Sequence, residues 1–264
     1  AIIPDNWFHD YQDLFYFSET RPGEDGVFLR RQHFQLIQEW ENQELVKTNL
    51  RTKTLNDLKL ETKEFPIPKN FKGTLRPYQL EGYRWMRTRQ AAGLGACLAD
   101  DMGLGKTTST IIAALETGAK KILIICPASL KINWEREIAN YTDRSVYIAE
   151  GKKFSTESDF VIVNYDILKN FHDPKEKDNS LLFKSEFELV ILDEAHMVSN
   201  AQAQRTKIIN SYVKTIKRVW LLTGTPMTSR PMNYYNLLNI IESPVAQNWM
   251  AYAIRYCQGY QFTA

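Results

Sequence analysis

A glycine-rich turn contains the first residues that could do chemistry. Gly103-Leu104-Gly105-Lys106-Thr107 follows a short apolar segment and precedes a helix-like segment. Glycines allow backbone N–H groups to approach a phosphate closely, and the start of a helix adds partial positive charge. In such a turn, Lys106 would reach the β- and γ-phosphates of a nucleotide, and the Thr107 hydroxyl would bind Mg²⁺. The spacing therefore predicts a phosphate-binding P-loop.

The P-loop pattern is incomplete at its first position. The full pattern Gly-x-x-x-x-Gly-Lys-Thr requires a glycine where this chain has Asp100. A glycine turn that arises by chance is therefore the alternative interpretation. The strand-like segment before the turn and the helix-like segment after it favour a nucleotide site, because a P-loop joins a strand to a helix.

A pair of carboxylates forms the second candidate group. Asp193 and Glu194 directly follow residues 189–192, an apolar run typical of a buried strand. In an open α/β sheet, ligands bind beyond the carboxyl ends of the strands. Asp193 could hold Mg²⁺ there, and Glu194 could orient and deprotonate an attacking water. The alternative is an acidic pair that caps the next helix, which the P-loop upstream makes the weaker interpretation.

The segments around both motifs alternate between strand-like and helix-like patterns. We expect strands near residues 95–99, 121–126, 146–149, 160–163, 189–192 and 218–222. We expect helices near residues 80–89, 106–116, 130–140, 203–213 and 231–241, and an exposed charged loop at 173–179. Strands that alternate with helices favour an α/β fold with a mainly parallel sheet flanked by helices. Such a sheet would place the glycine turn and the acidic pair on one side.

Composition and termini exclude several classes of protein. The 264 residues are 44% hydrophobic and 24% charged, as in a globular protein that buries its own core. No apolar run approaches the roughly 20 residues of a membrane-spanning helix, and no signal peptide is visible, so we expect an intracellular protein. The missing initial methionine suggests a processed chain or an excised fragment. Three scattered cysteines and four histidines indicate neither a disulfide framework nor a structural zinc site.

Residues 65–70 divide the chain into two regions. Two prolines in this segment disfavour a helix and indicate an extended connection. Residues 1–70 are predicted to be a small N-terminal accessory region, with many aromatic residues, a helix near 39–60 and no chemical motif. Its aromatic residues are typical of a core; a base-stacking surface is the alternative. Residues 71–264 are predicted to form the nucleotide-binding domain, whose mild basic excess permits a phosphate-rich partner.

Six blocks of sequence resemble, in order, the motifs of Swi/Snf-type ATPases of helicase superfamily two. They lie within residues 74–241 and comprise residues 75–86, 98–107, 126–137, 163–166, 193–196 and 222–226. That family also lacks the first P-loop glycine, so Asp100 agrees with the resemblance. The family usually has Asp-Glu before Met-Gly-Leu-Gly-Lys-Thr, where this chain has Asp100-Asp101. Residues 225–232 resemble the HepA-related, annealing-helicase branch.

The resemblance implies a RecA-like P-loop domain and a role for each block. Nucleotide-binding residues would be Arg76, Gln79, Asp101, Met102, Gly103, Leu104, Gly105, Lys106, Thr107 and Thr108. Lys106, Asp193 and Glu194 would be catalytic, and Thr107 and Asp193 would hold the metal. Coupling between the nucleotide and the nucleic acid would involve His196, Thr223, Gly224 and Thr225. Nucleic-acid contacts would come from Ser129, Asn164 and Tyr165.

Several of these roles have a structural alternative. Gln79, which would pair with the edge of adenine, could be an ordinary helix-surface residue, as could Arg76. Trp134 is expected in the core rather than as a stacking platform. Tyr165 could belong to either class, and Gly224 could simply end a strand.

The resemblance also implies the reaction and the partners. ATP hydrolysis with Mg²⁺ would drive movement along double-stranded DNA through the opening and closing of two RecA-like lobes. This chain would be the first lobe, and the second lobe of the full-length protein would supply arginine fingers, so hydrolysis by the chain alone would be slow. No membrane partner is expected. The alternatives are a lobe of a DEAH-type RNA helicase and a non-catalytic scaffold, and intact Lys106, Asp193 and Glu194 argue against the scaffold.

Overall fold

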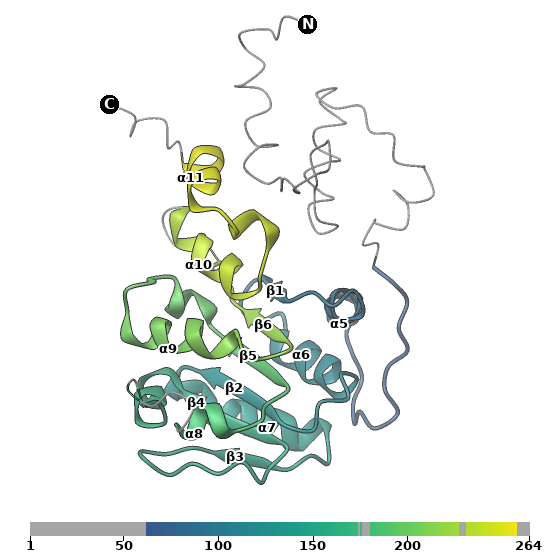
Figure 1. Ribbon diagram of the computed structural model, residues 1–264. Coiled ribbons are helices and arrows are strands. Elements are labelled where there is room, and N and C mark those ends of the chain that lie inside the picture. Colours follow the sequence, from purple (N-terminus) through teal and green to yellow (C-terminus); the bar gives the residue numbers. More distant parts are fainter. Residues whose placement is uncertain (1–61, 174, 176–179, 227–230, 258–264) are drawn as a thin grey trace, which may run out of the picture.

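A six-stranded parallel sheet organises the protein. The computed structural model describes residues 62–173, 175, 180–226 and 231–257. The strands are ordered β1-β6-β5-β2-β4-β3, and every neighbouring pair is parallel. Figure 1 shows this order from β1 near the top of the sheet to β3 at the bottom. The predicted α/β fold with a parallel sheet is thereby confirmed.

The strands form where the sequence has short apolar runs. Their bounds are β1 Ala96–Leu98, β2 Ile122–Cys126, β3 Val146–Ile148, β4 Phe160–Asn164, β5 Leu189–Asp193 and β6 Val219–Leu222. Every residue of β2, β4, β5 and β6 is buried. Continuous burial is the expected state of a parallel strand that is covered on both faces, and it explains why these segments lack polar alternation.

Helices cover both faces of the sheet. The α-helices are α5 Pro77–Ala91, α6 Lys106–Leu115, α7 Lys131–Tyr141, α8 Leu181–Lys184, α9 Gln204–Val213, α10 Met232–Ile240 and α11 Trp249–Cys257. Short 3₁₀ turns are η2 Ala128–Leu130, η3 Tyr165–Asn170, η5 Ala195–Val198 and η6 Pro244–Ala246. One core cluster joins one face of the sheet to α5, α6 and α7, and the second joins the other face to α8, α9 and α10 (Figure 1).

The strand order explains how distant segments meet at one edge. β6 lies between β1 and β5, and its Leu222 pairs with Leu98 at the end of β1 and with Asp193 at the end of β5. Because the strands are parallel, the loops that follow all three leave from the same edge of the sheet. We call this the carboxyl edge, and it contains the glycine turn, the acidic pair and Thr223.

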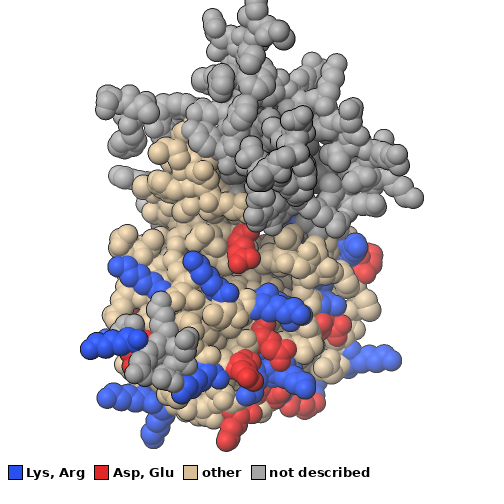
Figure 2. Space-filling model, viewed as in Figure 1, with Lys and Arg blue, Asp and Glu red and all other residues tan. Residues whose placement is uncertain are grey.

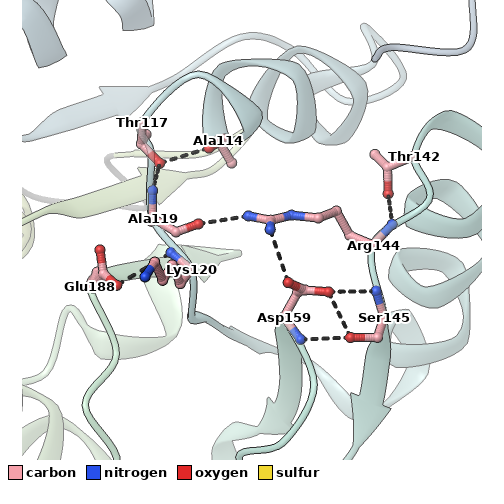
Figure 3. Close-up of polar contacts among 9 residues, drawn as sticks. All are labelled: Ala114, Thr117, Ala119, Lys120, Thr142, Arg144, Ser145, Asp159 and Glu188. Atoms are coloured by element: carbon pink, nitrogen blue, oxygen red, sulfur yellow. Dashed lines mark hydrogen bonds and ion pairs between the residues drawn. The ribbon is translucent and has the colours of Figure 1, made fainter.

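The opposite, amino edge is closed by a hydrogen-bond network (Figure 3). The Arg144 guanidinium donates to Asp159 Oδ1 at 2.9 Å and to the carbonyl oxygen of Ala119 at 2.7 Å. The backbone N–H and the hydroxyl of Ser145 both donate to Asp159 Oδ2, at 2.8 and 2.7 Å. These bonds connect the segments that lead into β2, β3 and β4.

The segment before α5 is extended, as its prolines predict, and it lies along that helix. The Tyr83 hydroxyl donates to the carbonyl oxygen of Pro66 at 2.7 Å, and the Arg84 guanidinium pairs with Glu64 at 2.7 Å. The Arg87 guanidinium lies 5.0 Å from the centre of the Phe65 ring. The placement of a domain boundary at residue 70 stays a prediction.

Predicted elements agree with the observed ones within a few residues, except at the start of α5. That helix begins at Pro77, before the expected residue 80, because proline fits the first helical turn and the Gln79 side chain accepts the N–H of Arg76. The predicted helix at 39–60, the aromatic region before it and most of the loop at 173–179 lie outside the described residues. Among the residues described, no helix is long and apolar enough to span a membrane.

Candidate nucleotide site

The glycine turn joins β1 to α6 through two residues with positive φ. Gly103 has φ +84° and Gly105 has φ +70°, backbone conformations that favour glycine, and Lys106 begins α6. A Cβ atom at Gly103 would meet no atom within 4 Å, so the turn is open on that side. Helix α6 therefore presents its first N–H groups at an open glycine turn, and this arrangement fits a phosphate group.

The Lys106 ammonium lies over the turn. Its Nζ donates to the carbonyl oxygens of Asp100 and Asp101 at 2.7 and 2.9 Å. The ammonium group of Lys106 therefore lies at the start of α6, on the same edge of the sheet as Asp193. This edge is where the sequence predicts both groups.

Gln79 of α5 packs directly against the glycine turn. A Cβ atom at Gly105 would lie 2.1 Å from Gln79 Nε2, so any larger residue there would displace the Gln79 amide. The amide oxygen of Gln79 accepts the backbone N–H of Arg76 at 3.0 Å, and the Ser109 hydroxyl donates to the Gln79 carbonyl oxygen at 3.0 Å. Gln79 thus lies at the site, while the Arg76 side chain is exposed at the start of the helix.

Asp193 ends β5 and is held by two donors. Its Oδ2 accepts the indole N–H of Trp134 at 2.8 Å, and its Oδ1 accepts the backbone N–H of Glu194 at 2.9 Å. Burial raises the pKa of the Asp193 carboxyl above its usual value, although both hydrogen bonds oppose that rise. Glu194 has φ +50°, which is rare for a residue with a side chain and typical of functional sites.

His196 links the acidic pair to the loop after β6. Its Nδ1 lies 3.1 Å from Glu194 Oε2 and 3.4 Å from the hydroxyl oxygens of both Thr223 and Thr225. Thr223 is fully buried, and its backbone N–H donates to the carbonyl oxygen of Leu98. The residues expected to couple the two halves of the site are therefore in contact with one another.

Gly224 allows the loop after β6 to pass close to the glycine turn. A Cβ atom at this position would lie 2.8 Å from Met102 Cγ and 3.4 Å from the Met102 backbone nitrogen. Met102 itself is 76% exposed. A larger residue at Gly224 would push the turn away, so the glycine has a packing role beyond ending a strand.

The residues present fit a magnesium–nucleotide complex. Each oxygen of Asp193 accepts one hydrogen bond and retains further acceptor capacity toward a ligand. A carboxylate and a threonine hydroxyl are hard oxygen ligands, which Mg²⁺ prefers together with phosphate oxygens and water. The described residues contain no group of three or more His, Cys, Asp or Glu that could hold a metal ion without a nucleotide.

Two residues that the resemblance assigns to nucleic-acid contacts lie inside this lobe, so those contacts stay predictions. Tyr165 is 1% exposed, and its hydroxyl donates to the carbonyl oxygen of Asp193 at 2.8 Å, so it belongs to the core. Asn164 is 6% exposed at the end of β4. The expectation came from the family resemblance; in the structure Asn164 ends the fully buried strand β4, Tyr165 begins η3 directly after it, and both side chains lie inside. Ser129, in η2, is exposed as that role requires.

The Thr108 side chain is engaged by helix α7. Its hydroxyl donates to Glu137 Oε2 of α7 at 3.1 Å, and the residue is 6% exposed. The side chain therefore points away from the turn, and only its backbone N–H remains as a donor to a phosphate. Asp101, Met102 and Leu104 are exposed in the turn.

The sequence reasoning missed the part that Trp134 plays. The prediction that it lies in the core is confirmed, since it is fully buried, but its hydrogen bond to Asp193 was not anticipated. No local signal could reveal this bond, because 59 residues separate the partners along the chain.

The charged surface gives no single basic face in the view of Figure 2. Lys and Arg side chains are interspersed with Asp and Glu over the described part of that face. On the described part of this face, binding of a nucleic acid would therefore depend on particular residues rather than on a continuous positive field.

Comparisons with known proteins agree with the geometry of the site. The chain matches the family model described as SNF2-related domain over residues 78–257. It is 32% identical over 195 residues to the SWI/SNF-related matrix-associated actin-dependent regulator of chromatin subfamily A-like protein 1 homolog of Caenorhabditis elegans, covering 71% of this chain and 27% of that protein. It is 31% identical over 191 residues to the ISWI chromatin-remodeling complex ATPase ISW1 of Saccharomyces cerevisiae, covering 66% of this chain and 16% of that protein.

A solved structure supports the same assignment. The SWI2/SNF2 ATPase core of Sulfolobus solfataricus in complex with dsDNA superposes with a TM-score of 0.62 at 27% identity, covering 74% of this chain and 42% of that chain. The chain thus spans less than half the length of each of these proteins. The DEAH-type RNA helicase alternative gains no support from these comparisons, and the annealing-helicase branch stays a prediction. The match over most of the chain shows that it belongs to the SNF2-related domain family.

Proposed function

We propose that this chain is the ATP-binding lobe of an ATP-dependent motor that moves on double-stranded DNA. The observation that carries the proposal is the meeting of Lys106, Asp193 and the coupling histidine, His196, at one edge of the sheet. Nucleotide phosphates would lie against the glycine turn, with Gln79 beside the base. Thr107 and Asp193 would hold Mg²⁺, which supplies charge neutralisation to the phosphates.

Each residue of the proposed nucleotide site then has a specific role. Lys106 would leave the two carbonyl oxygens that it contacts and pair with a phosphate. Glu194 would orient a water and accept its proton. His196, which contacts Glu194, Thr223 and Thr225, would couple a change at Glu194 to the loop after β6. Gln79 offers its NH₂ group to the base, because its amide oxygen is already engaged by Arg76.

Double-stranded DNA is the proposed partner because the similar Sulfolobus core was solved with dsDNA. On this lobe, Ser129 remains the exposed candidate for a phosphate contact. We further propose that the full-length protein, acting inside the cell, contains a second RecA-like lobe. The chain covers only 42% of the similar Sulfolobus ATPase core, and residues 78–257, which match the family, contain a single glycine turn of this type.

ATP hydrolysis by the full-length protein tests the proposal. We expect duplex DNA to stimulate hydrolysis more than single-stranded DNA or RNA does, and Lys106→Ala to abolish the stimulated rate. Lys120→Ala is the matched control, because Lys120 is an exposed lysine at the opposite edge of the sheet. Preferential stimulation by RNA, or an active Lys106→Ala variant, would contradict the proposal. The 264-residue chain alone should hydrolyse ATP slowly, and a fast DNA-stimulated rate would remove the need for a second lobe.

A further inference from the structure

The indole of Trp134 makes the closest side-chain contact to the proposed metal carboxylate. Its Nε1–H donates to Asp193 Oδ2 at 2.8 Å, and both side chains are buried, with 0% and 7% of their surfaces exposed. A buried hydrogen bond to a carboxylate is stronger than one in water, since no solvent competes for either partner. The contact therefore fixes the orientation of the Asp193 side chain.

The second oxygen of Asp193 is fixed as well. The backbone N–H of Glu194 donates to Oδ1 at 2.9 Å, and the Tyr165 hydroxyl donates to the backbone carbonyl oxygen of Asp193 at 2.8 Å. Among the described residues, Trp134 of helix α7 is the one donor to the carboxylate from an element other than β5 and the residue that follows it. If it were removed, rotation about the last side-chain bond would be limited by a single local contact.

Helix α7 also contacts the other half of the site. Three residues beyond Trp134, Glu137 accepts the hydroxyl of Thr108 in α6 at 3.1 Å, and Asn133 donates to the other oxygen of Glu137 at 3.1 Å. Helix α7 therefore forms hydrogen bonds both to α6, the helix that follows the glycine turn, and to the end of β5. Its N-terminus directly follows η2, where Ser129 is exposed.

We propose that Trp134 is a positioning residue that holds the Asp193 carboxylate in the orientation needed to bind a divalent cation beside the nucleotide. The proposal rests on the function proposed above, because it requires that Asp193 faces the cation. Partners that orient a metal-binding carboxylate without touching the metal commonly change its metal affinity when they are removed. Trp134 itself touches neither the nucleotide nor the cation in this account.

Binding of Mn²⁺, used in place of Mg²⁺, tests the proposal without relying on hydrolysis. The full-length protein is titrated with Mn²⁺ in the presence of saturating ADP, and free Mn²⁺ is followed by electron paramagnetic resonance. Trp134→Phe keeps an aromatic ring in the core and removes the N–H donor. We expect it to weaken Mn²⁺ binding about 10-fold, at the lower end of effects of this kind.

Trp220→Phe is the matched control. Trp220 is a fully buried tryptophan of β6 whose indole N–H has no hydrogen-bond partner among the described residues. The same substitution there removes a similar ring volume without removing a bond to Asp193, so Mn²⁺ affinity should stay at the wild-type value. Affinity for a fluorescent ADP analogue in the presence of EDTA should be unchanged in both variants.

The outcomes separate the two proposals. If wild-type protein binds Mn²⁺ with ADP and Trp134→Phe binds it equally well, Trp134 is only a core residue and the inference is overturned. Equal weakening in both variants would show a general loss of packing and would overturn it too. If the wild-type protein binds ADP but no Mn²⁺, the proposed metal site itself fails, and the inference fails with it.

Discussion

The two edges of the sheet contain aspartates in opposite environments. At the amino edge, burial pushes the pKa of Asp159 upward, but hydrogen bonds from Ser145 and the charge of Arg144 outweigh it and lower the pKa. At the carboxyl edge, burial raises the pKa of Asp193 and outweighs its two hydrogen bonds. One carboxylate is thus stabilised in its charged form by the fold, and the other is destabilised.

The opposite pKa shifts of Asp159 and Asp193 distinguish an edge that stabilises the fold from an edge that could bind a ligand. In the amino-edge network of Figure 3, Arg144, Ser145 and Asp159 satisfy one another's polar groups within the protein. At the carboxyl edge, Glu194 has a strained backbone conformation and the glycine turn is open. The Lys106 ammonium there donates to backbone carbonyl oxygens of the turn. A bound cation and phosphate would supply the compensating charges that this edge lacks.

The largest expected effect is a loss of ATP hydrolysis caused by a substitution at the carboxyl edge. Glu194→Gln should reduce kcat for ATP hydrolysis by about 10²–10⁴-fold, the usual contribution of a general base, while nucleotide affinity is kept. Glu188→Gln is the control at the amino edge, where the Glu188 carboxylate accepts the backbone N–H of Lys120 at 3.3 Å. Steady-state hydrolysis by the full-length protein measures both. Similar losses in the two variants would remove the distinction between the edges.

Glycines at the two edges should respond differently to the same substitution. Gly105 and Gly118 both have φ +70°, but a Cβ atom would meet Gln79 at Gly105 and nothing within 4 Å at Gly118. Alanine should cost about 1 kcal/mol of backbone strain at each position. Only Gly105→Ala should also weaken nucleotide binding, by about 10-fold or roughly 1.4 kcal/mol, because the added methyl would displace the Gln79 amide that is proposed to lie beside the base. Calorimetric titration with ADP measures it, and equal affinities would contradict the assigned turn.

Loss of the amino-edge network should reduce stability and leave the site intact. Asp159→Ala removes the acceptor of bonds from Arg144 and Ser145, which should lower the free energy of unfolding by about 1.5–3 kcal/mol. Urea denaturation measures the loss. Affinity for ADP should equal that of the wild type, and a weakened affinity would show that the two edges are coupled.

The smallest expected effect is the pH dependence of folding stability that the two aspartates contribute. The lowered pKa of Asp159 means that its stabilising contribution is present above its unfolded pKa of about 3.9 and is lost as pH falls through the lower folded value. Asp193 has the opposite sign: its raised pKa means that the cost of its charge is present at high pH and relieved as pH falls.

Denaturation between pH 7 and pH 3 compares the two aspartates directly. The stability advantage of wild type over Asp159→Asn should shrink as the pH falls. Relative to Asp193→Asn, the wild type should gain stability over the same range. Curves that move in the same direction would contradict the contrast between the two environments.

Of the two edges, the carboxyl edge can be read from the sequence, whereas the amino-edge network around Asp159 was not predicted. Apolar runs located the strands, and the positions of Lys106 and Asp193 after two of them predicted one shared edge, because parallel strands end on the same side. The sequence could not show that β6 lies between β1 and β5 or that Trp134 reaches Asp193, since both depend on the order in which distant strands pack. Nor could the sequence show that the hydroxyls of Tyr165 and Thr108 find partners inside the protein, at Asp193 and Glu137.

The most direct test of the account is a crystal structure of the full-length protein with Mg²⁺ and a non-hydrolysable ATP analogue. The account predicts phosphates against the backbone N–H groups of residues 103–107, with the cation beside Asp193 and Lys106 released from the Asp100 carbonyl. A hollow of about 500 Å³ at the amino edge, lined by Thr117, Phe187, Arg218 and their neighbours, is the place to look for a contrary result. Nucleotide bound there, with the glycine turn unchanged, would contradict the assignment of the carboxyl edge as the nucleotide site.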